Sequence, residues 1–136
     1  MARRLVLLLA FGFAFAASMG QREGARLVSL DPHEPRAAIS KPHGVDWKHI
    51  YTRSDDYRHE GAEIDLLYVD GDPHNVYQDV QRHKDLVKHR GLIIIDGYGG
   101  QAPVTQAVHG LIDIGMNFGM VPYTDKYAHA VCMVTR

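Results

Sequence analysis

Acidic side chains follow two short, largely apolar runs, and these side chains are where the chain could carry out chemistry. Asp70 and Asp72 follow residues 64–69, and Asp96 follows residues 92–95. Runs of this kind suit strands that are buried on both faces of a parallel sheet. Ligands of such sheets bind beyond the carboxyl ends of the strands. We therefore expect Asp70 and Asp96 to face one cleft, where clustered carboxylates need a cation or a ligand amine beside them.

Two further features are typical of a site for a nucleoside. Asp31 follows the apolar run 25–30, and an acidic residue at that position in Rossmann-like folds accepts the hydroxyls of a ribose. A turn aspartate before Pro32 is the structural alternative. The segment 11–16 follows the first apolar run and carries Gly12 and Ala14. A small-residue turn there would let the backbone approach a ligand, although alanine disfavours a positive φ.

Histidines offer candidates for proton transfer but no pattern of metal ligands. The nine histidines include no pair spaced to bind one ion from a single helix. His74 and His129 are the two that could line the cleft. His83 falls on the apolar side of a predicted helix, so we expect it to be packed. Asp72 precedes Pro73, and capping the following turn is the alternative to a role in the cleft.

The elements that must position these residues alternate between strands and helices. Val76, Val80 and Val87 recur at helical spacing, which predicts a helix over 75–89 with Asp79 on its solvent face. A second helix is expected over 103–114, with proline in its first turn. Strands are expected at 5–10, 25–30, 47–52, 64–69, 92–95, 118–123 and 129–135. The last two lack a helix between them and should pair antiparallel. The pattern predicts a doubly wound α/β domain with a mostly parallel sheet in three layers.

Bulk composition restricts the class of protein. The chain has 136 residues, enough for one domain, and a net charge of -1. This charge gives no sign of the basic surface with which proteins bind nucleic acids. The single cysteine, Cys132, excludes an internal disulfide, and its apolar surroundings predict a buried side chain.

The first residues have two interpretations. Residues 1–19 have the charged, apolar and small-residue regions of a secretory signal peptide, and their apolar part is too short to span a bilayer. The alternative is a buried strand over 5–10, followed by a small-residue turn. The downstream pattern favours the strand, because cleavage near Ser18 would remove it together with Gly12 and Ala14.

A resemblance to a known family rests on two strings and one tyrosine. The strings Ile64-Asp-Leu-Leu-Tyr-Val-Asp-Gly-Asp72 and Arg90-Gly-Leu-Ile-Ile-Ile-Asp96, with Tyr98, resemble the class I S-adenosylmethionine-dependent methyltransferases. The sequence is most similar to the branch with a hydrophobic-Asp-Gly-Asp-His motif, which includes macrocin-type O-methyltransferases and cephalosporin-hydroxylase-like proteins. The resemblance extends over about residues 5–136, as one domain without the family's usual N-terminal helices.

The resemblance implies S-adenosylmethionine as cofactor and O-methylation of a small molecule. It implies that Gly12 and Ala14 approach the methionine part, that Asp31 binds the ribose hydroxyls and that Asp55 lies near the adenine. Asp70 would flank the methionine or the reaction centre. The catalytic residues would be Asp70, His74 and Asp96, with Mg²⁺ held by Asp70 and Asp96 in a metal-dependent version.

Departures from the family's motifs keep other functions open. The family's first motif is an acidic residue followed by spaced glycines at the end of the first strand, and its acidic residue is missing here. Pro73 follows Asp72 at the position where the family usually has histidine, and His74 comes one place later. Gly97 stands where metal-dependent relatives carry a metal ligand. The alternatives are an inactive methyltransferase-like module that acts through protein contacts and a small secreted protein. The expected location is the cytoplasm, or outside the cell if residues 1–19 are a signal peptide. We expect a small-molecule acceptor, no nucleic-acid or membrane partner, and leave a homo-oligomer open.

Overall fold

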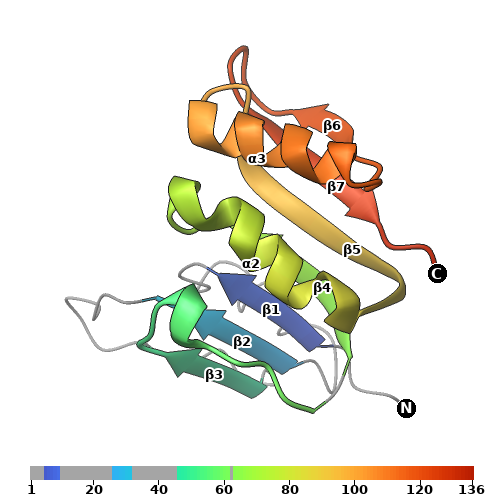
Figure 1. Cartoon of the computed structure of the whole chain (residues 1–136). Helices are drawn as coiled ribbons and strands as arrows, with labels where there is room; N and C mark the ends of the chain where they lie inside the picture. Colours follow the sequence, from blue (N-terminus) through green and yellow to red (C-terminus); the bar gives the residue numbers. More distant parts are fainter. Residues whose placement is uncertain (1–4, 10–25, 32–45, 62) are drawn as a thin grey trace.

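One seven-stranded sheet runs through the molecule (Figure 1). The computed structural model describes residues 5–9, 26–31, 46–61 and 63–136. The strands are β1 (Leu5–Leu9), β2 (Arg26–Leu30), β3 (Asp46–Ile50), β4 (Ile64–Val69), β5 (Val87–Tyr98), β6 (Gly119–Pro122) and β7 (Ala128–Met133). Their order across the sheet is β3-β2-β1-β4-β5-β7-β6. The predicted α/β fold with an antiparallel terminal hairpin is confirmed.

Strand direction decides where the ends of the strands meet. β3, β2, β1, β4 and β5 are parallel neighbours, whereas β7 is antiparallel to both β5 and β6. The carboxyl ends of the five parallel strands therefore lie along one edge of the sheet. The amino end of β7 lies at the same edge, because β7 runs in the opposite direction. This edge is the one at which ligands of open α/β sheets bind.

β1 occupies the middle of the sheet. Leu7 pairs with Val28 of β2 on one side and with Leu67 of β4 on the other. Its side chain is fully buried. The strand predicted over 5–10 is therefore present as Leu5–Leu9, and residues 1–19 include a central strand of the fold.

Two helices cover the sheet from the side that faces the viewer in Figure 1. They are α2 (Val76–His83) and α3 (Ala102–Asp113), and they contact each other as well as β4 and β5. Short 3-10 turns stand at Ser54–Asp56 (η1), Pro73–Asn75 (η2) and Lys84–Leu86 (η3). Residues 10–25 and 32–45, which include Gly12 and Ala14, lie outside the described part of the chain. No described helix has the length and apolar character needed to cross a membrane.

The helix predicted over 75–89 is too long at its carboxyl end. The α-helix stops at His83, and β5 begins at Val87, which is fully buried and pairs with Ile64. Gly91 permits this early pairing. A Cβ atom there would lie only 2.7 Å from Val87 Cγ1 and 3.0 Å from the Asp65 carbonyl oxygen. Burial of Val87 against the sheet thus outweighs the helical propensity of the residues around it.

Asp79 was predicted on the solvent face of the helix, and this is wrong. Its side chain is only 1 % exposed and lies 3.7 Å from Arg82 Nη1. Arg82 Nη1 also donates to the Ser54 carbonyl oxygen at 2.9 Å, and the Tyr57 ring stacks on that of His83. The segment around η1 therefore covers this side of α2. Burial raises the pKa of Asp79 and lowers that of His83, which is fully buried as expected.

The core lies between the sheet and the two helices. It is built from aliphatic side chains of the central strands and of the inner faces of the helices, among them Leu7, Val28, Leu67, Val80, Ile93, Ile95, Val108 and Leu111. Cys132 is also buried, as the sequence predicts, and so is Trp47. Trp47 Nε1 donates to Ser29 Oγ at 2.8 Å, so the polar atom of the indole is satisfied.

Candidate functional site

Asp70 and Asp96 come together at the carboxyl edge of the sheet. Val69 and Ile95 are paired across β4 and β5, and each aspartate is the next residue of its strand or loop. The surroundings partly desolvate the Asp70 carboxyl, although the residue as a whole is exposed. This burial, and then the charge and hydrogen bond of Asp96, raise the pKa of Asp70 to about 6. The pair is thus close enough for one carboxyl to control the protonation of the other.

Asp96 is held by two side chains of the terminal hairpin. Tyr123 Oη donates to Asp96 Oδ1 at 2.6 Å, and His129 Nε2 lies 3.3 Å from the same oxygen. The hydrogen bond to Asp96 is the largest of the causes that raise the pKa of Tyr123 to about 12. Tyr123 therefore keeps its proton at neutral pH and stays a donor. Both contacts hold the Asp96 side chain in place.

Aromatic rings surround this carboxylate, and we call Tyr68, Tyr123 and His129 the aromatic wall. The His129 ring lies 4.6 Å from that of Tyr123 and 6.1 Å from that of Tyr68, measured between centroids. Tyr68 Oη is 3.5 Å from His129 Nε2, and burial raises the pKa of Tyr68. The three side chains come from β4, β7 and the residue after β6. The site is therefore assembled from segments that lie far apart in the sequence.

The sequence indicated His129 as a candidate for the cleft but gave no sign of Tyr123. His129 is the residue paired with Asp96 across β5 and β7. The register of the antiparallel hairpin is the feature from which the positions of His129 and Tyr123 could have been predicted. Once β7 is placed against β5, the end of β6 and its tyrosine must lie at the same edge as Asp96.

Asp31 and Asp55 lie farther along the same edge. Asp31 follows β2, and its backbone N–H donates to the Ile50 carbonyl oxygen at 3.2 Å. Asp55 lies in η1 after β3, where Arg53 Nε is 3.1 Å from Asp55 Oδ1. β1 lies between β2 and β4 in the sheet, so the end of β1 separates Asp31 and Asp55 from Asp70. Gly12 and Ala14, predicted to follow β1, lie outside the described residues.

His74 stands apart from the two carboxylates in its contacts. Its backbone N–H donates to Asp72 Oδ1 at 3.0 Å, so Asp72 caps the turn η2 as the sequence allowed. The His74 residue is exposed. Within the described part of the chain, Asp96 contacts Tyr123 and His129 but not His74. The catalytic role of His74 remains a prediction.

The described residues do not fit a resident magnesium ion. Asp70 and Asp96 supply two carboxyl groups, but no group of three or more His, Cys, Asp or Glu side chains in the described part of the chain is placed to hold a metal. Asp96 Oδ1 is already engaged by Tyr123 and His129. Gly97 adds no side chain.

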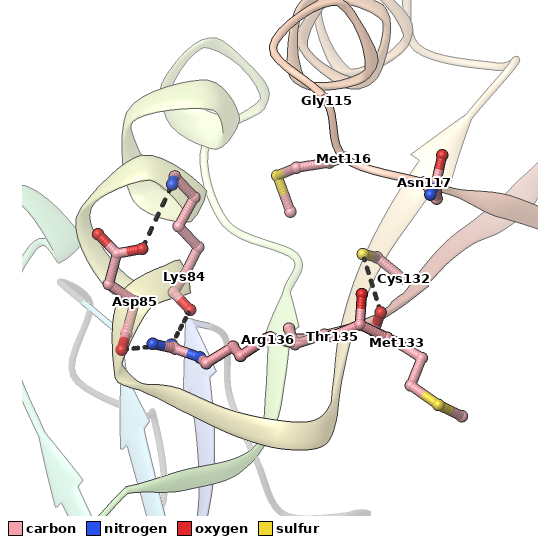
Figure 2. A pocket seen from close by; sticks show the side chains of 10 residues that line it. Lys84, Asp85, Gly115, Met116, Asn117, Cys132, Met133, Thr135 and Arg136 are labelled. Carbon is pink, nitrogen blue, oxygen red and sulfur yellow. Dashed lines mark hydrogen bonds and ion pairs between the residues drawn. The ribbon is translucent and has the colours of Figure 1, made fainter.

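A cavity of about 240 Å³ lies at the opposite edge of the sheet (Figure 2). It is lined by η3, by the residues after α3 and by the end of β7, including Lys84, Met116 and Cys132. Arg136 Nη2 donates to the carbonyl oxygens of Lys84, Asp85 and Val87 at 3.3, 2.5 and 2.8 Å. These bonds close the end of η3. The cavity is remote from Asp70 and Asp96, because it lies at the amino ends of the parallel strands.

Comparison with known proteins supports the fold. No protein-family model matches the sequence, and no curated protein is detectably similar to it in sequence. Solved structures do match. They include Aeropyrum pernix fibrillarin with natively bound S-adenosyl-L-methionine, at 16 % identity and a TM-score of 0.70, over 96 % of this chain and 66 % of that one. The O-methyltransferase of Bacillus cereus in complex with SAH matches at 14 % identity and 0.65, over 99 % and 74 %.

A third match is the O-methyltransferase TomG of Streptomyces achromogenes in complex with SAM, at 16 % identity and a TM-score of 0.67, over 99 % of this chain and 74 % of that one. The chain thus has the Rossmann-like α/β fold of these proteins, and it spans 66 to 74 % of their lengths. Similarity at this level of identity defines the fold. The finer assignment to the macrocin-type branch stays a prediction.

Proposed function

We propose that the protein is an S-adenosylmethionine-dependent methyltransferase that methylates an oxygen of a small molecule. The observation that carries the proposal is the pair Asp70 and Asp96 at the carboxyl edge of a sheet ordered β3-β2-β1-β4-β5-β7-β6. The structural neighbours crystallised with S-adenosylmethionine or its demethylated product have the same fold. A net charge of -1 favours a small acceptor over a polyanionic nucleic acid.

The residues of the site suit the removal of a proton from the acceptor. S-adenosylmethionine would supply an activated methyl group for an in-line displacement, in which positioning gives most of the acceleration. Asp70, with a pKa of about 6, is mostly ionised at neutral pH and can accept the hydroxyl proton. Asp96 is kept in place by Tyr123 and His129. Asp31 would accept hydrogen bonds from the two ribose hydroxyls.

Replacing Asp31 with alanine tests the cofactor site. A bidentate contact of a carboxylate with two hydroxyls is worth roughly 1.5–3 kcal/mol, so calorimetry should show S-adenosylmethionine binding about 10- to 100-fold more weakly. Asp46→Ala is the matched control. Its carboxylate is exposed at the amino end of β3 and lies 3.5 Å from Arg26 Nε, at the edge away from the site, so binding should not change. Equal binding by the Asp31 variant and the wild type would contradict the ribose contact.

Chelation separates metal-dependent from metal-independent transfer. We expect turnover to persist in EDTA and not to rise with added magnesium, because the described site lacks a third ligand. Activity that vanishes with chelator and returns with magnesium would reinstate Asp70 and Asp96 as metal ligands. His74→Ala is assayed in parallel, since loss of turnover in that variant alone would identify His74 as the base.

The main competing function is a module that has lost catalysis and acts through protein contacts. Alanines in place of glycines after β1 and the missing acidic residue favour it. Failure of S-adenosylmethionine and of its demethylated product to bind at millimolar concentration would support this alternative. We further propose a cytoplasmic location, which mass spectrometry of the expressed protein tests by showing whether cleavage occurs near Ser18.

A further inference from the structure

We propose that residues 51–61, the strap, are docked on α2 at neutral pH and are released when His83 is protonated in mildly acidic solution. The strap contains η1 and leads from the carboxyl end of β3 toward β4. It therefore lies at the edge of the sheet where the proposed cofactor site lies. The inference goes beyond the proposed function, and its tests require neither a cofactor nor turnover.

His83 is buried with one ring nitrogen bonded and the other unpaired. The residue is fully buried, and its Nδ1 lies 2.9 Å from the Asp79 carbonyl oxygen. Because a carbonyl oxygen only accepts, Nδ1 carries the proton and Nε2 is the atom that a second proton would reach. Nε2 has no hydrogen-bond partner among the described residues. Protonation would thus bury a charge and an unpaired N–H, which is unfavourable.

The charged groups near His83 also oppose its protonation. Burial is the largest cause that lowers the pKa of His83. The positive charges of Arg82 on α2 and of His59 and Arg58 on the strap lower it further, whereas the bond to the Asp79 carbonyl acts in the opposite direction. The docked state therefore loses stability relative to the released state as the pH falls through the ordinary histidine pKa of about 6.5.

Few contacts hold the strap on α2, and one of them is made by His83 itself. The Tyr57 ring lies 6.2 Å from that of His83 between centroids, at an interplanar angle of 24°. Arg82 Nη1 donates to the Ser54 carbonyl oxygen at 2.9 Å. None of residues 51–61 is fully buried. A segment with so few buried contacts can open locally while the sheet stays folded, and opening would admit water to His83.

Asp79 is the second buried titratable group beside the strap, and its effect has the opposite sign. Burial is the largest cause that raises its pKa, and the carboxylates of Asp55 and Asp72 act in the same direction. Ser54 and Arg82 lower it by a smaller amount. The docked state thus binds a proton at Asp79 more tightly than the released state does, so acid favours docking through this group. Release in acid cannot come from Asp79.

Hydrogen exchange measured by mass spectrometry tests the release on the full chain without ligand. Peptides covering residues 51–61 are compared with peptides of β4 and β5, with labelling times scaled for the intrinsic pH dependence of exchange. From about pH 7.5 to about pH 5.5, one unit below the pKa of a solvated histidine, we expect exchange in the strap to rise about five- to tenfold. The strands should not change. An unchanged strap, or an equal rise in β4 and β5, would overturn the inference.

Substitutions assign the release to His83. His83→Phe keeps a ring against Tyr57 but cannot be protonated, so the strap should exchange equally at both pH values. His83→Gln gives the same test if circular dichroism shows that the phenylalanine variant is unfolded. His59→Gln is the matched control, because it removes a histidine of the strap itself and should keep the acid release. Acid release that persists without His83, or that disappears in His59→Gln, would contradict the proposal.

Proton NMR of the His83 ring supplies an independent readout. Its signal is assigned by its absence from the spectrum of His83→Gln. We expect it to titrate at a lower pH than that of His109, which is exposed on α3. If His83 titrates together with His109 while exchange in the strap stays slow, protonation does not release the strap and the inference fails. Because no step of these experiments uses S-adenosylmethionine, such a failure would leave the proposed function standing.

Discussion

Replacing Asp70 with asparagine is expected to lower turnover about 100- to 10,000-fold, the range that general-base catalysis contributes. Asparagine keeps the size of the side chain but cannot accept the acceptor's proton. Burial and the charge of Asp96 raise the pKa of Asp70 to about 6. Turnover of the wild type should therefore fall as the pH drops through about 6, because Asp70 becomes protonated there. The residual activity of the variant should lack this acidic limb.

The same pKa shift predicts an effect on stability that does not depend on turnover. The folded protein binds a proton at Asp70 more tightly than the unfolded chain does, so this group's contribution to stability decreases as the pH rises from about 4 to 6. Asp70→Asn removes that unfavourable contribution. The melting temperature of the variant should exceed that of the wild type at pH 7, and the difference should vanish near pH 4.

Asp72→Asn is the control for both readouts. Asp72 is exposed and accepts a hydrogen bond from the backbone of His74, so its substitution should leave turnover nearly unchanged. Asp96→Asn should also lower turnover, because it removes the negative charge of the carboxylate that Tyr123 and His129 contact. If Asp70→Asn and Asp96→Asn both leave turnover intact, the two carboxylates have no part in catalysis.

Much of the fold could be predicted from the sequence because buried strands appear in it as short apolar runs. The apolar runs at 64–69 and 92–95 can be satisfied only inside a covered sheet, and both are strands in the structure. The end of α2 could not be located in the same way. Val87 fits a helical stripe and a strand equally well, and its pairing with Ile64 decides between them. Asp79 was misplaced for a related reason, since only the packing of the segment around η1 on α2 shows that its face is covered.

The part of the candidate site at the ends of the parallel strands could be predicted from the sequence. The part that depends on the register of the antiparallel strands could not. Asp70 directly follows β4 and Asp96 lies near the carboxyl end of β5, so a parallel arrangement of the two strands is enough to bring them to one edge. Tyr123 reaches Asp96 only through the pairing of β6 with β7 and of β7 with β5. Nothing in the residues around Tyr123 distinguishes it from a tyrosine of an ordinary surface turn.

Leu7→Ala is expected to lower the free energy of unfolding by about 2–5 kcal/mol, as for other buried leucines whose side chain is removed from a core. Leu7 is fully buried in β1, between β2 and β4, so the substitution should leave a cavity that the paired strands cannot close. Urea denaturation measures the change as a lower midpoint at an unchanged slope. Since folded domains are typically stable by only about 5–15 kcal/mol, this loss is large enough to threaten folding at 37 °C.

The Leu7 variant also tests whether residues 1–19 contribute a strand to the sheet or form a signal peptide. Ile114→Ala is the control, because Ile114 is 51 % exposed and its truncation should change stability by less than about 0.5 kcal/mol. If Leu7→Ala is as stable as this control, β1 does not belong to the folded sheet. Residues 1–19 would then be free to act as a signal peptide, and the cofactor turn predicted around Gly12 would lose its support. A loss near 3 kcal/mol would mean that cleavage near Ser18 removes a strand on which the site at the carboxyl edge depends.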